Sequence, residues 1–144
     1  MKESCKDYLN RIELRSFNEI LFSFIDKSGH KDSEIYKKGD IDRKLFSKIR
    51  CNNDYIPRKN VIIKLCLALG LERNDFNKLL NSAGYSLSNS KFDQVIAYCL
   101  ENKVYNLNQV NDYLYTFCSA SLWVFFCRFL SDHLLFYVLY NEYS

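Results

Sequence analysis

Apolar residues recur three and four positions apart along most of this chain, and short polar or glycine-containing stretches separate these patterns. Such spacing places apolar side chains on one face of an α-helix, so it predicts a series of amphipathic helices. The clearest example covers residues 43–50, where Leu45, Phe46 and Ile49 share one face. Asp42 stands directly before this segment and is a candidate N-cap.

A second, shorter helix and a turn are expected just before this segment. Asp32 or Ser33 can cap the short helix, and Ile35 is its inward residue. Gly39 and Asp40 then interrupt the helical pattern. Because glycine readily adopts left-handed dihedral angles, we expect a tight turn with Gly39 at the end of the short helix.

The rest of the chain predicts further helices and no strands. Only one proline and four glycines occur in 144 residues, which leaves little room for a turn-rich β fold. The expected helices run from Ser16 to about Ser28, after Pro57 to Leu71, from Asn74 or Asp75 to Gly84, from Ser88–Ser90 to about Lys103, and from Asn106 or Asn108 through Phe117. The expected fold class is therefore all-α.

We divide the chain into three parts. Residues 1–15 are expected to form an N-terminal arm or linker helix, residues 16–118 a helical domain, and residues 119–144 an aromatic, apolar segment that is also helical. A hydrophobic content of 48% excludes a disordered chain.

The C-terminal segment changes character. Arg128, Asp132 and His133 interrupt its apolar run, and the remaining apolar pieces are too short to cross a bilayer. We expect a buried or dimer-forming helix, and a membrane-attached or aggregation-prone tail is the alternative. The candidate dimer surface consists of Trp123, Phe126, Phe129 and Leu130.

Positive charge is concentrated in one part of the chain. The formal net charge is +3, but residues 37–64 carry nine Lys/Arg against three Asp/Glu, which gives +6 there. A focused patch of this kind attracts phosphate groups. A solvated basic face without a ligand is the simpler interpretation.

The pattern of Ile35, the turn at residues 39–40, Ile41, Phe46 and Ile49 resembles the helix-turn-helix of the XRE or lambda-repressor-like family. Pro57 and the apolar helix that ends in "ALGL" continue the resemblance, which covers roughly residues 17–84. It implies a lambda-repressor-like bundle, here extended by additional C-terminal helices, in which those four apolar residues form the helix-turn-helix core.

A narrower resemblance is to a variant found C-terminal to bacterial macro-domain proteins, which process ADP-ribose. The segments IDRKLFSKIR, NDYIPRKN and NSAGYSLSNSKFD carry it. The sequence departs from the general family at two positions: Tyr36 stands where a small residue is usual, and Asp40 stands where the turn glycine is usual.

The resemblance implies a DNA-binding transcriptional regulator, and the geometry of a recognition helix assigns the roles. Residues at the start of such a helix reach base edges in the major groove, so Arg43, Lys44 and Ser47 are the base-contact candidates. The phosphate-contact candidates are Lys48, Arg50, Arg58 and Lys59. Tight binding to double-stranded DNA would require a homodimer that reads two half-sites about 34–36 Å apart.

The competing hypothesis is a protein-interaction module, such as an adaptor, inhibitor or sensor in a bacterial or phage defence-related system. The helix-turn-helix would then serve only as scaffold. An enzyme is not expected, because His30 and His133 lie far apart and no nucleophile, phosphate-loop or metal-ligand spacing occurs. We therefore expect no cofactor and no metal. Six scattered cysteines and a charged N-terminus suggest a reducing cytoplasm.

Overall fold

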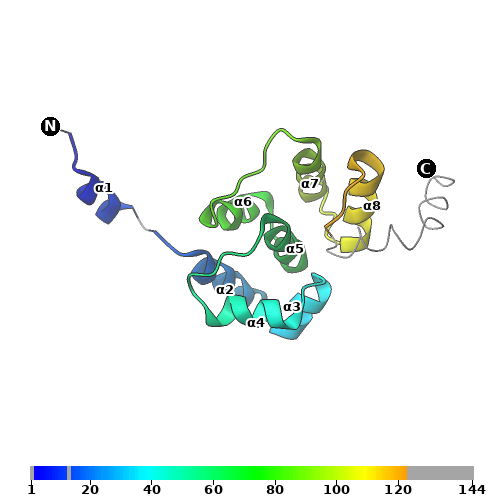
Figure 1. Ribbon diagram of the computed structural model, residues 1–144, viewed down its shortest axis with the longest axis horizontal. Helices are drawn as coiled ribbons and strands as arrows, with labels where there is room; N and C mark the ends of the chain where they lie inside the picture. The colour runs from blue at the N-terminus through cyan, green and yellow to red at the C-terminus, as the bar shows by residue number, and fades with distance from the viewer. Residues whose placement is uncertain (1, 13, 123–144) are drawn as a thin grey trace.

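The computed structural model describes residues 2–12 and 14–122, and this part of the chain is all-α with eight helices and no strands (Figure 1). The all-α prediction is confirmed. The helices are α1 (Cys5–Arg11), α2 (Phe17–Ser28), α3 (Asp32–Lys38), α4 (Arg43–Cys51), α5 (Lys59–Leu69), α6 (Arg73–Ser82), α7 (Lys91–Glu101) and α8 (Leu107–Cys118).

Helix α5 lies at the centre of the bundle (Figure 1). It packs against α2, α3, α6 and α8, and its residues 61–68 are all buried. Helices surrounded on every side lose the polar face that a surface helix keeps, which explains the nearly unbroken apolar run of this segment. All other core helices present one apolar stripe to α5 or to its neighbours, so α5 fixes the position of the elements around it.

Helix α1 stands away from the bundle at the N-terminal end (Figure 1). None of its residues is buried, and its first turn is held by Ser4, whose Oγ accepts a hydrogen bond from Asp7 N at 3.1 Å. It falls within residues 1–15, the segment for which an arm or linker helix is expected.

Several helix starts follow ordinary capping chemistry. Ser16, Ser90 and Asn106 each accept a hydrogen bond from a backbone N–H in the first turn of α2, α7 and α8. Gly29 ends α2 with φ 71°, a left-handed conformation that glycine adopts at little cost.

The expected caps of α3 and α6 were wrong. The N-cap of α3 is Lys31, whose backbone N–H donates to the Glu34 carboxylate at 3.4 Å. Asp32 is instead the first helical residue, and its carboxylate accepts from Arg50 at 2.6 Å. The N-cap of α6 is Glu72, so this helix begins before the Asn74 or Asp75 expected as its start.

Residues 123–144 lie outside the described part of the chain. The four residues of the candidate dimer surface, Trp123, Phe126, Phe129 and Leu130, belong to this segment, so that hypothesis stays a prediction. Within residues 2–12 and 14–122, no helix is long and apolar enough to cross a membrane.

Candidate nucleic-acid interface

Helix α4 has one buried face and one cationic face. Phe46 and Ile49 are 3% and 0% exposed and point into the bundle. The polar side chains on the remaining arc are all exposed to solvent: Arg43, Lys44, Ser47, Lys48 and Arg50. α4 lies at the edge of the bundle and packs against α3 (Figure 1), which leaves the cationic face open.

The residues expected to form the helix-turn-helix core are brought together. Ile35 is 2% exposed, Ile41 is 6% exposed, and both belong to the same apolar cluster as Phe46 and Ile49. Burial of a large apolar side chain contributes about 1.5–3 kcal/mol, so these residues hold α4 firmly on the bundle.

In the turn between α3 and α4, the left-handed residue is Asp40 and not Gly39, which corrects the expectation. Asp40 has φ 51°, whereas Gly39 has φ −83°. Gly39 is required for a different reason: a Cβ there would lie 3.2 Å from the backbone oxygen of Lys64 and 3.3 Å from that of Ile35. The turn is therefore pressed against α5.

A buried lysine on α5 completes this turn. Lys64 is only 3% exposed, and its Nζ donates a hydrogen bond of 3.1 Å to the backbone carbonyl of Asp40. Burial lowers the pKa of Lys64, and the nearby charge of Asp40 partly opposes that effect. The sequence did carry a signal for this residue, because Lys64 interrupts the apolar run VIIKLCLAL at an inward position.

Asn18 on α2 holds the other end of α4 and was also missed. Its side chain is buried, and Nδ2 donates to the backbone oxygen of Ile49 at 2.6 Å. Carbonyls in the last turn of a helix lack intrahelical partners, so this bond satisfies one of them. No local sequence pattern indicates it, because the two residues lie 31 positions apart.

Tyr36 is accommodated at the crossing of α3 and α4. It is half-buried, and its ring packs on Phe46 with centroids 5.6 Å apart and planes at 51°. Phe22 from α2 meets the same Phe46 ring at 6.2 Å in an edge-to-face arrangement. Such aromatic pairs contribute about 0.5–1.5 kcal/mol each beyond simple burial. Tyr36 thus belongs to an aromatic cluster that supports α4.

Two of the four phosphate-contact candidates have partners within the chain. Arg50 pairs with Asp32 and lies over the ring of Phe22 at 4.1 Å. Lys59 Nζ lies 2.7 Å from the Asp93 carboxylate. The other two candidates, Lys48 and Arg58, are exposed and form no ion pair with a described residue, although Lys48 lies 4.3 Å from the Tyr55 ring centroid.

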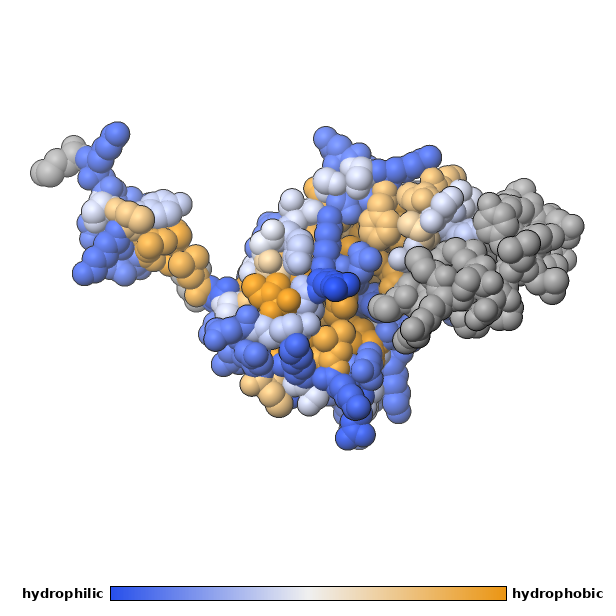
Figure 2. Space-filling model, in the orientation of Figure 1, coloured by the Kyte–Doolittle hydropathy of each residue, from blue (hydrophilic) through white to orange (hydrophobic). Residues whose placement is uncertain are grey.

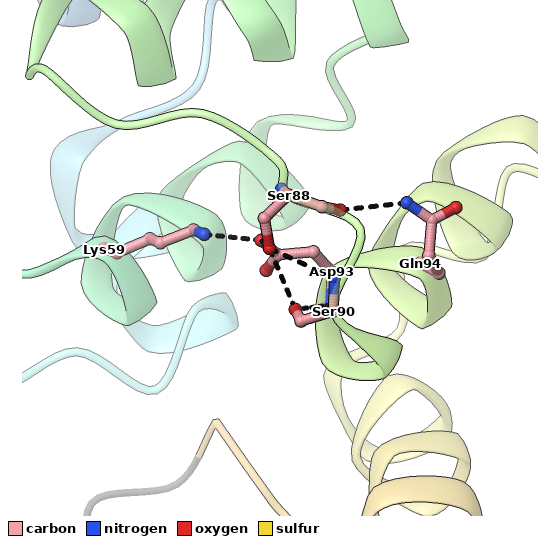
Figure 3. A network of polar contacts seen from close by, with 5 residues as sticks. All are labelled: Lys59, Ser88, Ser90, Asp93 and Gln94. Atoms are coloured by element: carbon pink, nitrogen blue, oxygen red, sulfur yellow. Dashed lines mark hydrogen bonds and ion pairs between the residues drawn. The ribbon is translucent and has the colours of Figure 1, made fainter.

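The Lys59–Asp93 pair is part of a polar network that joins α5 to the start of α7 (Figure 3). The Asp93 carboxylate also accepts hydrogen bonds from the backbone N–H and the hydroxyl of Ser88, at 2.7 and 2.8 Å. Asp93 N donates to Ser90 Oγ, and Gln94 Nε2 donates to the Ser88 carbonyl. Lys59 and Asp93 lie 34 positions apart, so no local sequence pattern indicates the network.

The charge state of Asp93 follows from these contacts. Burial by itself raises the pKa of the Asp93 carboxyl, but hydrogen bonds from Lys59 and Ser88 outweigh it and hold the pKa below its ordinary value. Asp93 is thus a buried carboxylate compensated by a lysine, and Lys59 serves a structural purpose in this arrangement.

Nothing in the described part of the chain indicates a metal centre, because no group of three or more His, Cys, Asp or Glu side chains is placed to hold an ion. His30 is exposed and lies beside Glu34 at 3.1 Å. Comparisons with protein families, with curated proteins and with solved structures found no match to this chain.

Proposed function

We propose that this chain is a DNA-binding protein of the lambda-repressor-like helix-turn-helix type that acts as a transcriptional regulator. The exposed cationic face of α4 is the observation that carries the proposal. Arg43, Lys44 and Lys48 project from this helix while its apolar face is anchored by Phe46 and Ile49. A helix about 10–12 Å wide with its side chains fits the major groove of B-DNA, which is about 12 Å wide.

The order of the residues along α4 assigns the contacts. Arg43, Lys44 and Ser47 occupy the first two turns, the part of a recognition helix that meets base edges. Arginine and lysine can pair with guanine O6 and N7, and serine can bond to several bases. Lys48 further along α4 and Arg58 before α5 are exposed and would neutralise phosphates.

Binding to duplex DNA by charge-matched variants tests the proposal. Arg43→Ala/Lys44→Ala removes two positive charges from α4, and Lys6→Ala/Lys78→Ala removes two exposed charges from α1 and α6. Measured by fluorescence anisotropy at 50 mM salt, the first variant should bind at least about tenfold more weakly, because it loses two direct contacts. Equal weakening by both variants would show that only total charge matters.

A protein-interaction module is the second candidate, and two observations favour it. Arg50 and Lys59 are already paired with aspartates, so part of the positive charge around α4 is neutralised within the chain. Aromatic side chains are also exposed elsewhere, with Tyr98 at 50% and Phe117 at 53%. A module of this kind would bind its partner with little dependence on salt, whereas phosphate-driven binding weakens steeply.

A further inference from the structure

Helices α7 and α8 leave an apolar groove open on the surface. Val95, Tyr98, Tyr113 and Phe117 line it, together with the longer side chains of Lys91 and Gln94, and it encloses about 460 Å³. Figure 2 shows apolar surface in the region of these two helices. The Tyr98 and Tyr113 rings meet edge to face at 5.8 Å, so the floor of the groove is ordered by aromatic packing.

The groove exposes aromatic side chains to solvent. Tyr98 and Phe117, from facing helices, are both about half exposed at 50% and 53%. Leaving a large apolar side chain in water forgoes burial free energy, and contiguous apolar patches usually mark a binding surface. The groove is therefore a candidate binding surface.

The described chain after α8 turns back onto this helix. Ser119 takes a left-handed conformation with φ 51°, and Ala120 N bonds back to the Leu114 carbonyl at 3.3 Å. Leu122 N then donates to Asn111 Oδ1 at 2.8 Å, and the Leu122 side chain is buried. The chain thus reverses and is anchored against α8, the helix that also supplies one wall of the groove.

We propose that residues 123–144 dock into the α7–α8 groove of their own chain. This segment of 22 residues contains eight aromatic side chains, which matches the aromatic lining of the groove. The anchor at Leu122 and the groove share α8, a helix only about 10–12 Å across, so even a few extended residues at about 3.3–3.6 Å each reach around it. Tethering makes docking intramolecular, at an effective concentration in the millimolar range.

The charge of the groove is compatible with the charges of residues 123–144. The one charged residue that lines the groove is Lys91, and residues 123–144 carry Asp132 and Glu142 against a single Arg128. In this arrangement the aromatic segment covers its own chain, which differs from the dimer surface that the sequence analysis suggested. The inference does not depend on DNA binding.

Site-specific photocrosslinking of the full chain tests the docking. Replacing Tyr98 by p-benzoylphenylalanine puts a reactive ketone into the groove, and the same replacement at Tyr8 on α1 is a control with matched exposure of 48%. After irradiation and peptide mapping, the Tyr98 probe should link within one chain to residues 123–144, at a yield independent of protein concentration. The Tyr8 probe should not form that link.

A second variant tests whether the crosslink depends on the groove. Phe117→Ser removes an exposed groove residue, so the bundle stays folded by circular dichroism while the crosslink from position 98 falls several-fold. Crosslinks between two chains, whose yield rises with concentration, would overturn the proposal in favour of a second copy as occupant. Absence of any link to residues 123–144 would overturn it as well.

Discussion

Lys64 and Asp40 connect the centre of the bundle to the turn that precedes α4. The Lys64 Nζ donates to the Asp40 carbonyl at 3.1 Å across 24 residues of sequence, and Lys64 is 3% exposed. A buried ammonium group is costly unless it has a partner, and here that partner is the backbone of the turn. The orientation of the cationic face of α4 therefore depends on contacts made by α5.

Gly39→Ala should destabilise the protein although its φ of −83° suits any residue. The added Cβ would lie 3.2 Å from the Lys64 backbone oxygen, and helix backbone cannot easily move aside. We expect a loss of about 1–3 kcal/mol in the free energy of unfolding, measured by urea denaturation. Gly84→Ala is the control for crowding, because its site is open and only its φ of 82° is unfavourable. An unchanged midpoint for Gly39→Ala would contradict the close packing of this turn.

The stability of the protein should depend on pH through Asp93. The pKa of this carboxyl is lower in the folded protein than in the unfolded chain, where it is about 3.9. The corresponding stabilisation is therefore complete above about pH 4 and is lost as the pH falls through the folded-state pKa. Asp93→Asn should lower the free energy of unfolding by about 1–3 kcal/mol at pH 7. The difference from the wild type should shrink toward pH 3.

The matched control for Asp93 is a surface ion pair. Arg73 pairs with Glu101, and both side chains are about half exposed. Because solvent screens such pairs, Glu101→Gln should change stability little at either pH. A loss for Asp93→Asn that stayed constant from pH 7 to pH 3 would argue against a carboxylate role for Asp93.

Arg43 and Arg58 should affect DNA binding in different ways. Arg43 lies at the start of α4, so Arg43→Ala should cost about 1–3 kcal/mol on the preferred sequence and relax discrimination. Arg58 precedes α5, so Arg58→Ala should weaken binding to all sequences about equally. Selection from a randomised duplex pool, followed by affinity measurements, separates the two effects. If both variants lost the same affinity on every sequence, the assignment of Arg43 to bases and of Arg58 to phosphates would be wrong.

Cysteine reactivity provides an independent check on the core. Cys66 and Cys99 are buried, and burial raises the pKa of Cys99 to about 11 and that of Cys66 further. Exposed Cys51 should react with iodoacetamide at pH 8 at least about a hundredfold faster than either, because only the thiolate is nucleophilic. Peptide mapping of the labelled protein, with and without guanidinium, measures the labelling rate of each cysteine. Fast labelling of Cys66 in native buffer would contradict the position of α5.

The helix periodicity predicted much of this fold, because the inward positions are set by local spacing. Phe46 and Ile49 on α4 were placed inward from their spacing alone, and both are buried. The first residues of the helices were less predictable. Lys31 and Glu72 are the N-caps of α3 and α6, but neither side chain forms a capping hydrogen bond, so their residue types do not indicate a helix start. The local pattern therefore predicts which face of a helix is buried better than where the helix begins.

The candidate site depends more on contacts between distant residues. Lys59 has the charge expected of a phosphate contact, but it forms an ion pair with Asp93. The two residues meet only because α7 packs near α5. Gly39 looked like a conformational requirement, whereas the close approach of Lys64 is what excludes a side chain there. Sequence spacing cannot show either relation, because both depend on tertiary packing.

The salt dependence of DNA binding tests the central claim most directly. Two of the phosphate-contact candidates, Lys48 on α4 and Arg58 before α5, are exposed and form no ion pair with a described residue. Neutralising two phosphates gives a slope of about −1.8 in a plot of log K against log salt, or a loss of about tenfold between 50 and 200 mM. That slope should become shallower by about 2 in Lys48→Ala/Arg58→Ala and stay nearly unchanged in Arg43→Ala/Lys44→Ala, whose side chains are assigned to base edges. Affinity that is independent of salt, or a slope that is the same in Lys48→Ala/Arg58→Ala, would contradict α4 as a DNA-recognition helix.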